Sequence, residues 1–337
     1  MPAMHAQLFI RYGVLVLSVL ICVGAFVTSL ALGQYSVSLQ DVWLAFWHPD
    51  PSAIEHVIVT TIRLSRSVVA VSVGAALAVA GVLMQTLTRN PLASPAIFGV
   101  NAGAVFFIVL ASQWFAMSAM SDLVWIAFLG AAVAGALVYT LGSMGRDAQS
   151  PVRMVLAGAA VTALFMAFTQ GILVVGQEGV DSVLFWVAGS VSGRELDVIT
   201  PVLPYLLGVM LAALFLAPHM NILLSGDDVA TGLGVNTTLL KAALSVLVII
   251  LAGASISMAG NIGFIGLVVP HMARAVVGND HKWLLLLSAI WGASLLLIAD
   301  VAGRLMIAPQ EVPIGVMTAL IGTPFFIYLA RKGKRDA

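Results

Sequence analysis

The chain has 337 residues, of which 61% are hydrophobic and only 9% are charged, and its mean hydropathy is +1.07. A soluble domain carries about a quarter charged residues, so this composition excludes a water-soluble globular protein. The net charge of zero gives no sign of nucleic-acid binding, and the lone Cys22 excludes an internal disulfide and a cysteine metal cluster.

Apolar runs near the length that a bilayer requires recur along the whole chain. Period-two alternation of strands is absent, so spanning helices are favoured over a barrel. The first run is longer than the apolar core of a signal peptide and is expected to be retained as a span. The sequence predicts an all-α polytopic protein with about ten transmembrane helices, at 11–33, 64–88, 96–115, 123–143, 153–176, 199–217, 237–258, 263–278, 283–303 and 313–331.

Between these spans, a polar stretch at 34–63 is expected to be an external loop, and a short helix is expected at 181–192. No soluble domain fits in the remainder, so 1–337 is predicted to be a single transmembrane domain. A weak internal repeat suggests two weakly related halves. Ala80-Gly81 precedes Pro91 by ten residues, and Ala259-Gly260 precedes Pro270 by the same interval.

The positive-inside rule sets the predicted orientation. With both termini cytoplasmic, the inside carries eleven basic residues and the outside four. The inside set is Arg11, Arg89, Arg146, Arg153, Lys241, Arg274, Lys282, Arg331, Lys332, Lys334 and Arg335; the outside set is Arg63, Arg66, Arg194 and Arg304.

The sequence contains few residues that could perform chemistry. It has no phosphate-binding GxxxxGK[ST] loop and no HExxH motif, and its six histidines are scattered. Ion-coupled carriers place ionisable groups inside their spans, whereas here Asp300 and Arg304 are spaced as a helical ion pair. We therefore expect a transport subunit that is not an enzyme, holds no cofactor and depends on a partner for energy. An ion-coupled transporter and an integral membrane enzyme are the alternative classes.

One acidic element, SGDDVATGLGVN at 225–236, interrupts two apolar runs. Ser225 is expected to cap a short helix, with Asp227 and Asp228 in its first turn. Gly232 and Gly234 are expected to end this helix, and Asn236 to cap the next one. A plain connecting loop is the alternative. A few residues of loop would be enough to connect the two runs. Ordering a capped helix costs conformational entropy, so its presence suggests that a partner docks on it.

Three long blocks resemble the permease subunits of ABC importers for ferric siderophores, haem and cobalamin, the FecCD type, and the ferric-citrate permeases look closest. The blocks are IRLSRSVVAVSVGAALAVAGVLMQTLTRNPLASPAIFGVNAGA (62–104), GNIGFIGLVVPHMARAVVG (260–278) and ADVAGRLMIAPQEVPIGVMTALIGTPFFIYL (299–329). The resemblance implies a type II ABC importer permease fold in the cell inner membrane. It implies import of a ferric siderophore, or alternatively of haem or cobalamin.

The resemblance also implies partners and site residues. The partners are two cytoplasmic ATPase subunits, a substrate-binding protein outside, and a second permease copy or paralogue. The region at about 223–236 would be the coupling helix that docks on the ATPase, through Ser225, Gly226, Asp227, Asp228, Val229, Ala230, Thr231, Gly232, Leu233 and Gly234. Docking of the binding protein would fall to Arg63, Arg66 and Arg304. Pathway or structural motif residues would be Asn90, Pro91, Gly263, Gly266, Pro270 and His271. No residue is expected to be catalytic or to bind a metal.

Overall fold

The computed structural model describes residues 2–117, 119–144, 151–175, 186–307 and 309–333. Within these ranges the chain is helical, apart from turns and one isolated bridge between Ile307 and Gln310. Among the described residues, seven helical segments are long and apolar enough to cross a membrane, and three shorter apolar helices accompany them. Together these correspond to the ten predicted spans.

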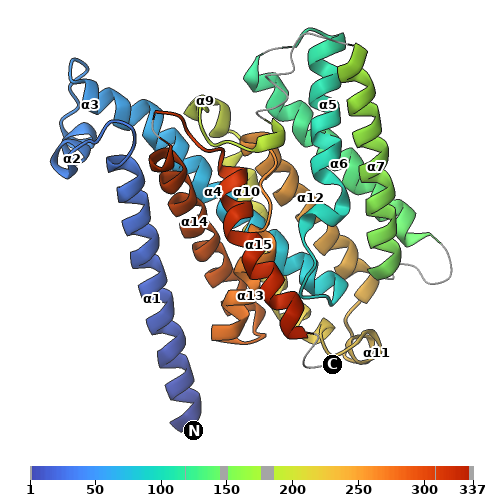
Figure 1. Ribbon diagram of the computed structural model, residues 1–337. Helices are drawn as coiled ribbons and strands as arrows, with labels where there is room; N and C mark the ends of the chain where they lie inside the picture. The colour runs from blue at the N-terminus through green and yellow to red at the C-terminus, as the bar shows by residue number, and fades with distance from the viewer. Residues whose placement is uncertain (1, 118, 145–150, 176–185, 308, 334–337) are drawn as a thin grey trace.

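The elements follow one another as a bundle with short connections (Figure 1). Their bounds in chain order are α1 (Pro2–Ala31), α2 (Leu39–Trp47), α3 (Ile54–Val57), the π-helical turn η1 (Ile58–Arg63), α4 (Leu64–Thr88), the 3₁₀ turn η2 (Pro95–Phe98), α5 (Val100–Trp114), α6 (Met120–Ser143), α7 (Pro151–Val175), α9 (Leu196–Ile199), α10 (Leu203–Leu223), α11 (Asp227–Gly232), α12 (Thr237–Ala259), α13 (Ile265–Val277), α14 (His281–Met306) and α15 (Ile314–Gly333).

Helix α4 lies at the centre of the bundle and packs against α14, α12 and α13. Small residues allow this close approach, as is typical of membrane helices. A Cβ atom added to Gly81 would overlap the backbone of Gly266 in α13, and one added to Gly74 would overlap the backbone of Gly292 in α14. The position of α4 therefore depends on glycine at these crossings.

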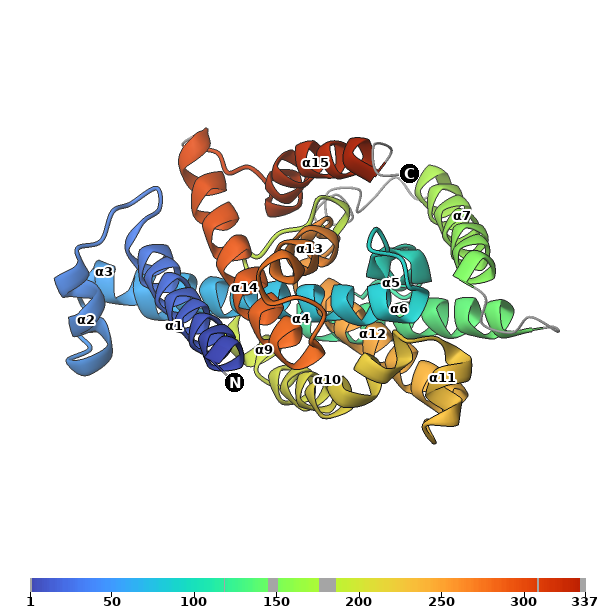
Figure 2. The same ribbon diagram turned by 90° about the horizontal axis from the view of Figure 1, so that it is seen from below.

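The helices at the two flanks are much less covered. In the most apolar window of α1 and of α7 only 22% of residues are buried, against 83% in the segment that contains α4. α1 packs mainly on α14, and α7 packs on α5 and α6. Figure 2 shows these two helices on opposite sides of the bundle, with α15 along a third side.

The structure differs from the sequence predictions in two connections. The stretch 34–63, expected to be a loop, contains α2, α3 and η1. Ser38 caps the first of these helices, α2, by accepting a hydrogen bond from the Asp41 amide at 3.1 Å. Of the helix expected at 181–192, residues 181–185 lie outside the described residues, and only 186–188 are helical. The two prolines of the weak internal repeat also lie in different structures: Pro91 follows α4 in a loop, whereas Pro270 lies inside α13.

Candidate functional site: the α11 element and the opposite end of the bundle

The acidic element forms the short helix α11, at the end of the bundle where α4 ends and α12 begins (Figure 1). Its first turn holds Asp227 and Asp228, as predicted. The expected cap is wrong: Gly226 is the N-cap, with a φ of 109° that favours glycine, and Ser225 makes no capping bond. Asn236 does cap α12, accepting a hydrogen bond from the Leu239 amide at 2.9 Å.

Asp227 fastens α11 to the body of the bundle. One carboxylate oxygen accepts a hydrogen bond from Arg89 at 2.5 Å, and the other accepts one from Lys241 at 2.7 Å. Arg89 caps the end of α4 and also donates to the Leu223 carbonyl at 3.1 Å. One carboxylate thus connects α4, α10, α11 and α12. Sequence reasoning missed Arg89 as a partner because 138 residues separate it from Asp227.

The charges around Asp227 also govern its protonation. Partial burial would raise the pKa of the carboxyl group, but the hydrogen bond and positive charge of Lys241 and the charge of Arg89 outweigh it. The pKa of Asp227 is consequently lowered, and the carboxylate is ionised at neutral pH. Asp228 beside it is exposed.

The outward face of the element is apolar at two positions. Val229 is 50% exposed and Leu233 is 66% exposed, whereas Ala230 is fully buried beneath them. Gly234, with a φ of 83°, then turns the chain toward α12. The surface of this short helical element therefore exposes two aliphatic side chains, Val229 and Leu233, and the carboxylate of Asp228.

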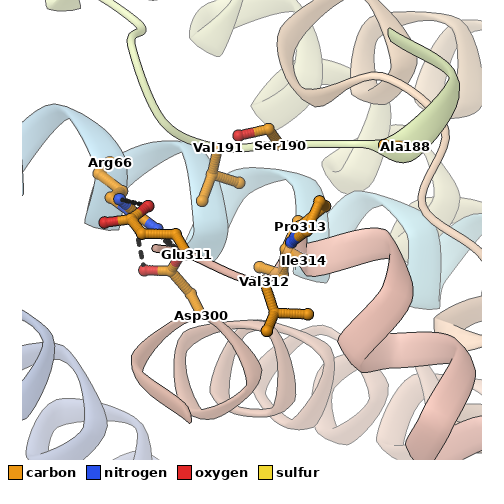
Figure 3. Close-up of a pocket in the computed structure, with 9 residues that line it drawn as sticks. All are labelled: Arg66, Ala188, Ser190, Val191, Asp300, Glu311, Val312, Pro313 and Ile314. Carbon is orange, nitrogen blue, oxygen red and sulfur yellow. Dashed lines mark hydrogen bonds and ion pairs between the residues drawn. The ribbon is translucent and has the colours of Figure 1, made fainter. Parts of the chain in front are cut away.

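At the opposite end of the bundle, which we call the α2 end, arginines and acids form a buried network. Asp300 of α14 lies between Arg66 of α4 and Arg304 of its own helix. Arg66 also pairs with Glu311 at 2.8 Å, on the connection between α14 and α15. Figure 3 shows Arg66, Asp300 and Glu311 converging beside a cavity of about 130 Å³. The predicted ion pair of Asp300 with Arg304 is confirmed.

The same end holds Arg63, which donates to the carbonyl groups of Leu30 and Ala31, both at 2.7 Å, and to that of Tyr35. Arg304 donates to the Ser29 and Leu32 carbonyls at 3.0 Å. The three arginines predicted to dock a partner are only 3–8% exposed, and they connect α1, α4 and α14 in this conformation. The sequence pattern indicated their side of the bundle but not their burial.

The remaining predicted motif residues are spread over the bundle and form no single site. Asn90 accepts a hydrogen bond from the Leu92 amide at 2.9 Å and shapes the turn that contains the exposed Pro91. His271 of α13 lies edge-on to Phe325 of α15, with ring centres 5.9 Å apart. The others lie on or before α13: Gly263 precedes it, Gly266 contacts α4, and Pro270 is buried inside it.

A further cavity, which sequence reasoning did not find, opens between η2, α5 and α7. It has a volume of about 430 Å³ and is lined by Gly99, Asn101, Thr162, Gln170, Asn261 and neighbouring apolar residues. The Asn101 side chain donates to that of Asn261, which joins the start of α5 to the connection between α12 and α13. Among the described residues, no group of three or more His, Cys, Asp or Glu side chains is arranged to hold a metal ion.

Comparison with known proteins assigns the family. The profile of the FecCD transport family matches residues 20–332, nearly the whole chain. The chain belongs to the FecCD transport family. This FecCD permease is 48% identical over 325 residues to a Bacillus subtilis protein named probable siderophore transport system permease YfiZ, covering 96% of this chain and 97% of that one.

Other relatives and a solved structure agree. The Fe(3+)-citrate import permease YfmD of Bacillus subtilis is 41% identical, over 96% of both chains. An inward-facing structure described as a metal-chelate type ABC transporter matches with a TM-score of 0.84 at 30% identity, over 95% of this chain and 99% of that one. The FecCD permease is therefore a membrane-spanning transport subunit with the ABC importer permease fold, as the resemblance implied.

Proposed function

We propose that this FecCD permease carries a ferric chelate of the siderophore class across the cell inner membrane, driven by a separate ATPase. The family match over nearly the whole chain carries the proposal. The siderophore and ferric-citrate permeases among its relatives support the substrate class. Both termini lie on the cytoplasmic side in this proposal, supported by the excess of basic residues at the end of the bundle that carries α11.

In this proposal α11 is the coupling element on which the ATPase docks. Two features of the described residues support it: the exposed pair Val229 and Leu233, and the rigid fastening of Asp227 to Arg89 and Lys241. The short helix α11 is bonded to α4 and α12 through Asp227 and to α10 through Arg89. A displacement of α11 by a docked partner would therefore be transmitted to these three spanning helices. Asp227 then has a positioning role, while Val229, Leu233 and Asp228 make the contact.

The complete importer would contain two ATPase subunits, a second permease copy or paralogue, and a binding protein at the α2 end. The docking role of Arg63, Arg66 and Arg304 stays a prediction. Their guanidinium groups are engaged within the chain here, so a partner would first meet the surface around them, where the Glu311 side chain is 31% exposed. Charge complementarity at such a surface would orient the partner.

Replacement of Leu233 by Glu tests the ATPase contact. The added carboxylate should abolish co-purification of the ATPase and uptake of the ferric chelate, while the permease stays inserted, because position 233 is on the surface. Phe115→Glu is the matched control for co-purification and should leave the bound ATPase unchanged, since Phe115 is also 66% exposed but lies at the α2 end, away from α11. Normal co-purification and uptake with Leu233→Glu would contradict the docking role of α11.

A further inference from the structure

The short helix α2 has an apolar face that the chain leaves largely uncovered. Leu39, Val42, Trp43, Phe46 and Trp47 recur at i, i+3, i+4, i+7 and i+8, which places them on one side of the helix. Such a face normally packs against a core. Here Leu39, Trp43 and Trp47 are each 63–65% exposed. The face therefore requires a covering that the described part of the chain does not supply.

This face forms one wall of an open groove, and the end of α1 forms the other. The α1 wall consists of Phe26, Val27 and Leu30, and the groove has a volume of about 570 Å³. Figure 1 shows α2 beside this end of α1, at the edge of the bundle. Leu30 and Val42 are buried in an apolar cluster separate from the main core. The floor of the groove is thus packed, while its mouth is open.

The groove lies where α1 leaves the membrane. The apolar segment Phe9–Ala31 has 23 residues, which at 1.5 Å per residue gives a length of about 34 Å. A hydrocarbon core of about 30 Å would therefore end near Leu30. The groove continues the sparsely covered, lipid-facing side of α1, of which only 22% is buried. Trp43 and Trp47 pack together with ring centres 5.5 Å apart, and tryptophan is enriched at this depth.

The surface beside the groove is acidic. Residues 34–62 contain Asp41, Asp50 and Glu55 and no Lys or Arg. Arg63, which follows them, is 5% exposed and donates to backbone carbonyl groups. Carboxylates at a membrane surface repel anionic lipids and attract ammonium groups. A zwitterionic headgroup with a free amine therefore complements this surface better than an anionic headgroup.

We propose that this groove binds one phospholipid of the leaflet at the α2 end. An acyl chain lies between α1 and α2 against Trp43 and Trp47, and the headgroup, of the phosphatidylethanolamine type, lies beside the carboxylates of residues 34–62. Burial of the chain removes from water the apolar surface that α2 exposes. The lipid thereby holds α2 at the membrane surface, as amphipathic helices are held at interfaces. The site depends on the membrane-spanning fold and not on the identity of the substrate.

Retention of lipid by the purified full-length permease tests the site. The protein in detergent is incubated with equal amounts of phosphatidylethanolamine and phosphatidylglycerol that have the same acyl chains, and bound lipids are counted by native mass spectrometry. The wild type should retain one phosphatidylethanolamine that the double variant Trp43→Ala/Trp47→Ala binds about tenfold more weakly, because one wall is lost. Trp114→Ala is the matched control, since Trp114 is 72% exposed but does not line the groove.

Two single substitutions address the occupancy and the headgroup separately. Val27→Trp fills the groove from the α1 side and should displace the lipid while α2 is unaltered, which decides the matter if the double variant fails to fold. The wild type should prefer phosphatidylethanolamine about fivefold. Gln40→Lys, on the exposed polar side of α2, should lower this preference. Ser121→Lys adds the same charge to exposed α6, away from the groove, and should leave it unchanged.

The outcomes are distinct. Loss of the lipid in the double variant and in Val27→Trp, but not in Trp114→Ala, would support the site. Equal retention by the wild type and Val27→Trp would overturn it. Equal binding of the two lipids by the wild type would overturn the headgroup selection. If the double variant instead converts a permease dimer into monomers, the groove is an interface between copies and the lipid site is wrong.

Discussion

At the scale of single residues, two adjacent acids have opposite roles. Asp227 is held by Arg89 and Lys241, whereas Asp228 is exposed at the surface of α11. The sequence shows only a pair of aspartates in a first helical turn. The difference arises because Arg89 and Lys241 reach Asp227 from other helices, which local sequence patterns do not reveal.

Asp227→Asn should therefore loosen α11, and Asp228→Asn should not. Loss of the charge at position 227 removes two charge-assisted hydrogen bonds that hold the element on α4 and α12. Amide hydrogen exchange over 226–235 should become faster in Asp227→Asn and remain as in the wild type in Asp228→Asn. Equal exchange in the two variants would contradict the fastening role of Asp227.

Falling pH should loosen α11 in the same way. The pKa of Asp227 is lowered in the folded chain, so its contribution to stability is present above the ordinary Asp value of about 3.9. That contribution is lost as the pH falls from this value through the lowered pKa. Exchange protection of 226–235, corrected for intrinsic rates, should hold down to about pH 5 and fall below about pH 4. Asp227→Asn should lack this acid transition.

At the α2 end, Asp300 is the residue on which the arginine network depends. Asp300→Asn would leave Arg66 and Arg304 buried without their shared carboxylate, and breaking such a buried pair costs about 3–5 kcal/mol. Glu311→Gln, at a carboxylate whose side chain is 31% exposed, should cost about 1 kcal/mol or less. Thermal unfolding in detergent measures both. A smaller loss for Asp300→Asn than for Glu311→Gln would contradict the arrangement.

At the scale of elements, the glycine crossings hold α4 in the centre. The sequence predicted most spans from apolar length alone, and Asn236 as the cap of α12 from its residue type and place. It could not predict which glycines are contacts. Gly81 and Gly171 both lie in apolar helices, but a Cβ added to Gly81 would meet the backbone of Gly266, whereas one added to Gly171 would have no atom of the described residues within 4 Å. Only the packing of helices distant in sequence distinguishes them.

Gly81→Ala should accordingly destabilise the bundle, and Gly171→Ala should not. The new methyl group at position 81 would collide with a backbone carbonyl that cannot turn aside, and overpacking of this kind costs about 1–3 kcal/mol. At position 171 the methyl group enters open space, and the helix gains up to about 1 kcal/mol. Thermal unfolding of the two variants in detergent checks this contrast. Similar melting temperatures would show that the crossing is not tight.

At the scale of the whole molecule, the chain is a transport subunit, and a separate ATPase subunit supplies the energy for transport. Composition, orientation signals and the absence of a phosphate-binding loop indicated this from the sequence. The buried arginines at the α2 end and the cavity between η2, α5 and α7 were beyond such reasoning, because each depends on residues from several helices. In the proposed function, the α11 end contacts the ATPase and the α2 end faces the binding protein.

The energy source tests this account most directly. Right-side-out membrane vesicles are prepared from cells that express the whole importer, and the substrate-binding protein is added outside. The vesicles are assayed for uptake of a radiolabelled ferric chelate of the siderophore class. The account predicts that uptake requires ATP inside the vesicles, survives an uncoupler that collapses the proton gradient, and is lost in Leu233→Glu. Uptake that proceeds without ATP and stops with the uncoupler would show an ion-coupled carrier and contradict it.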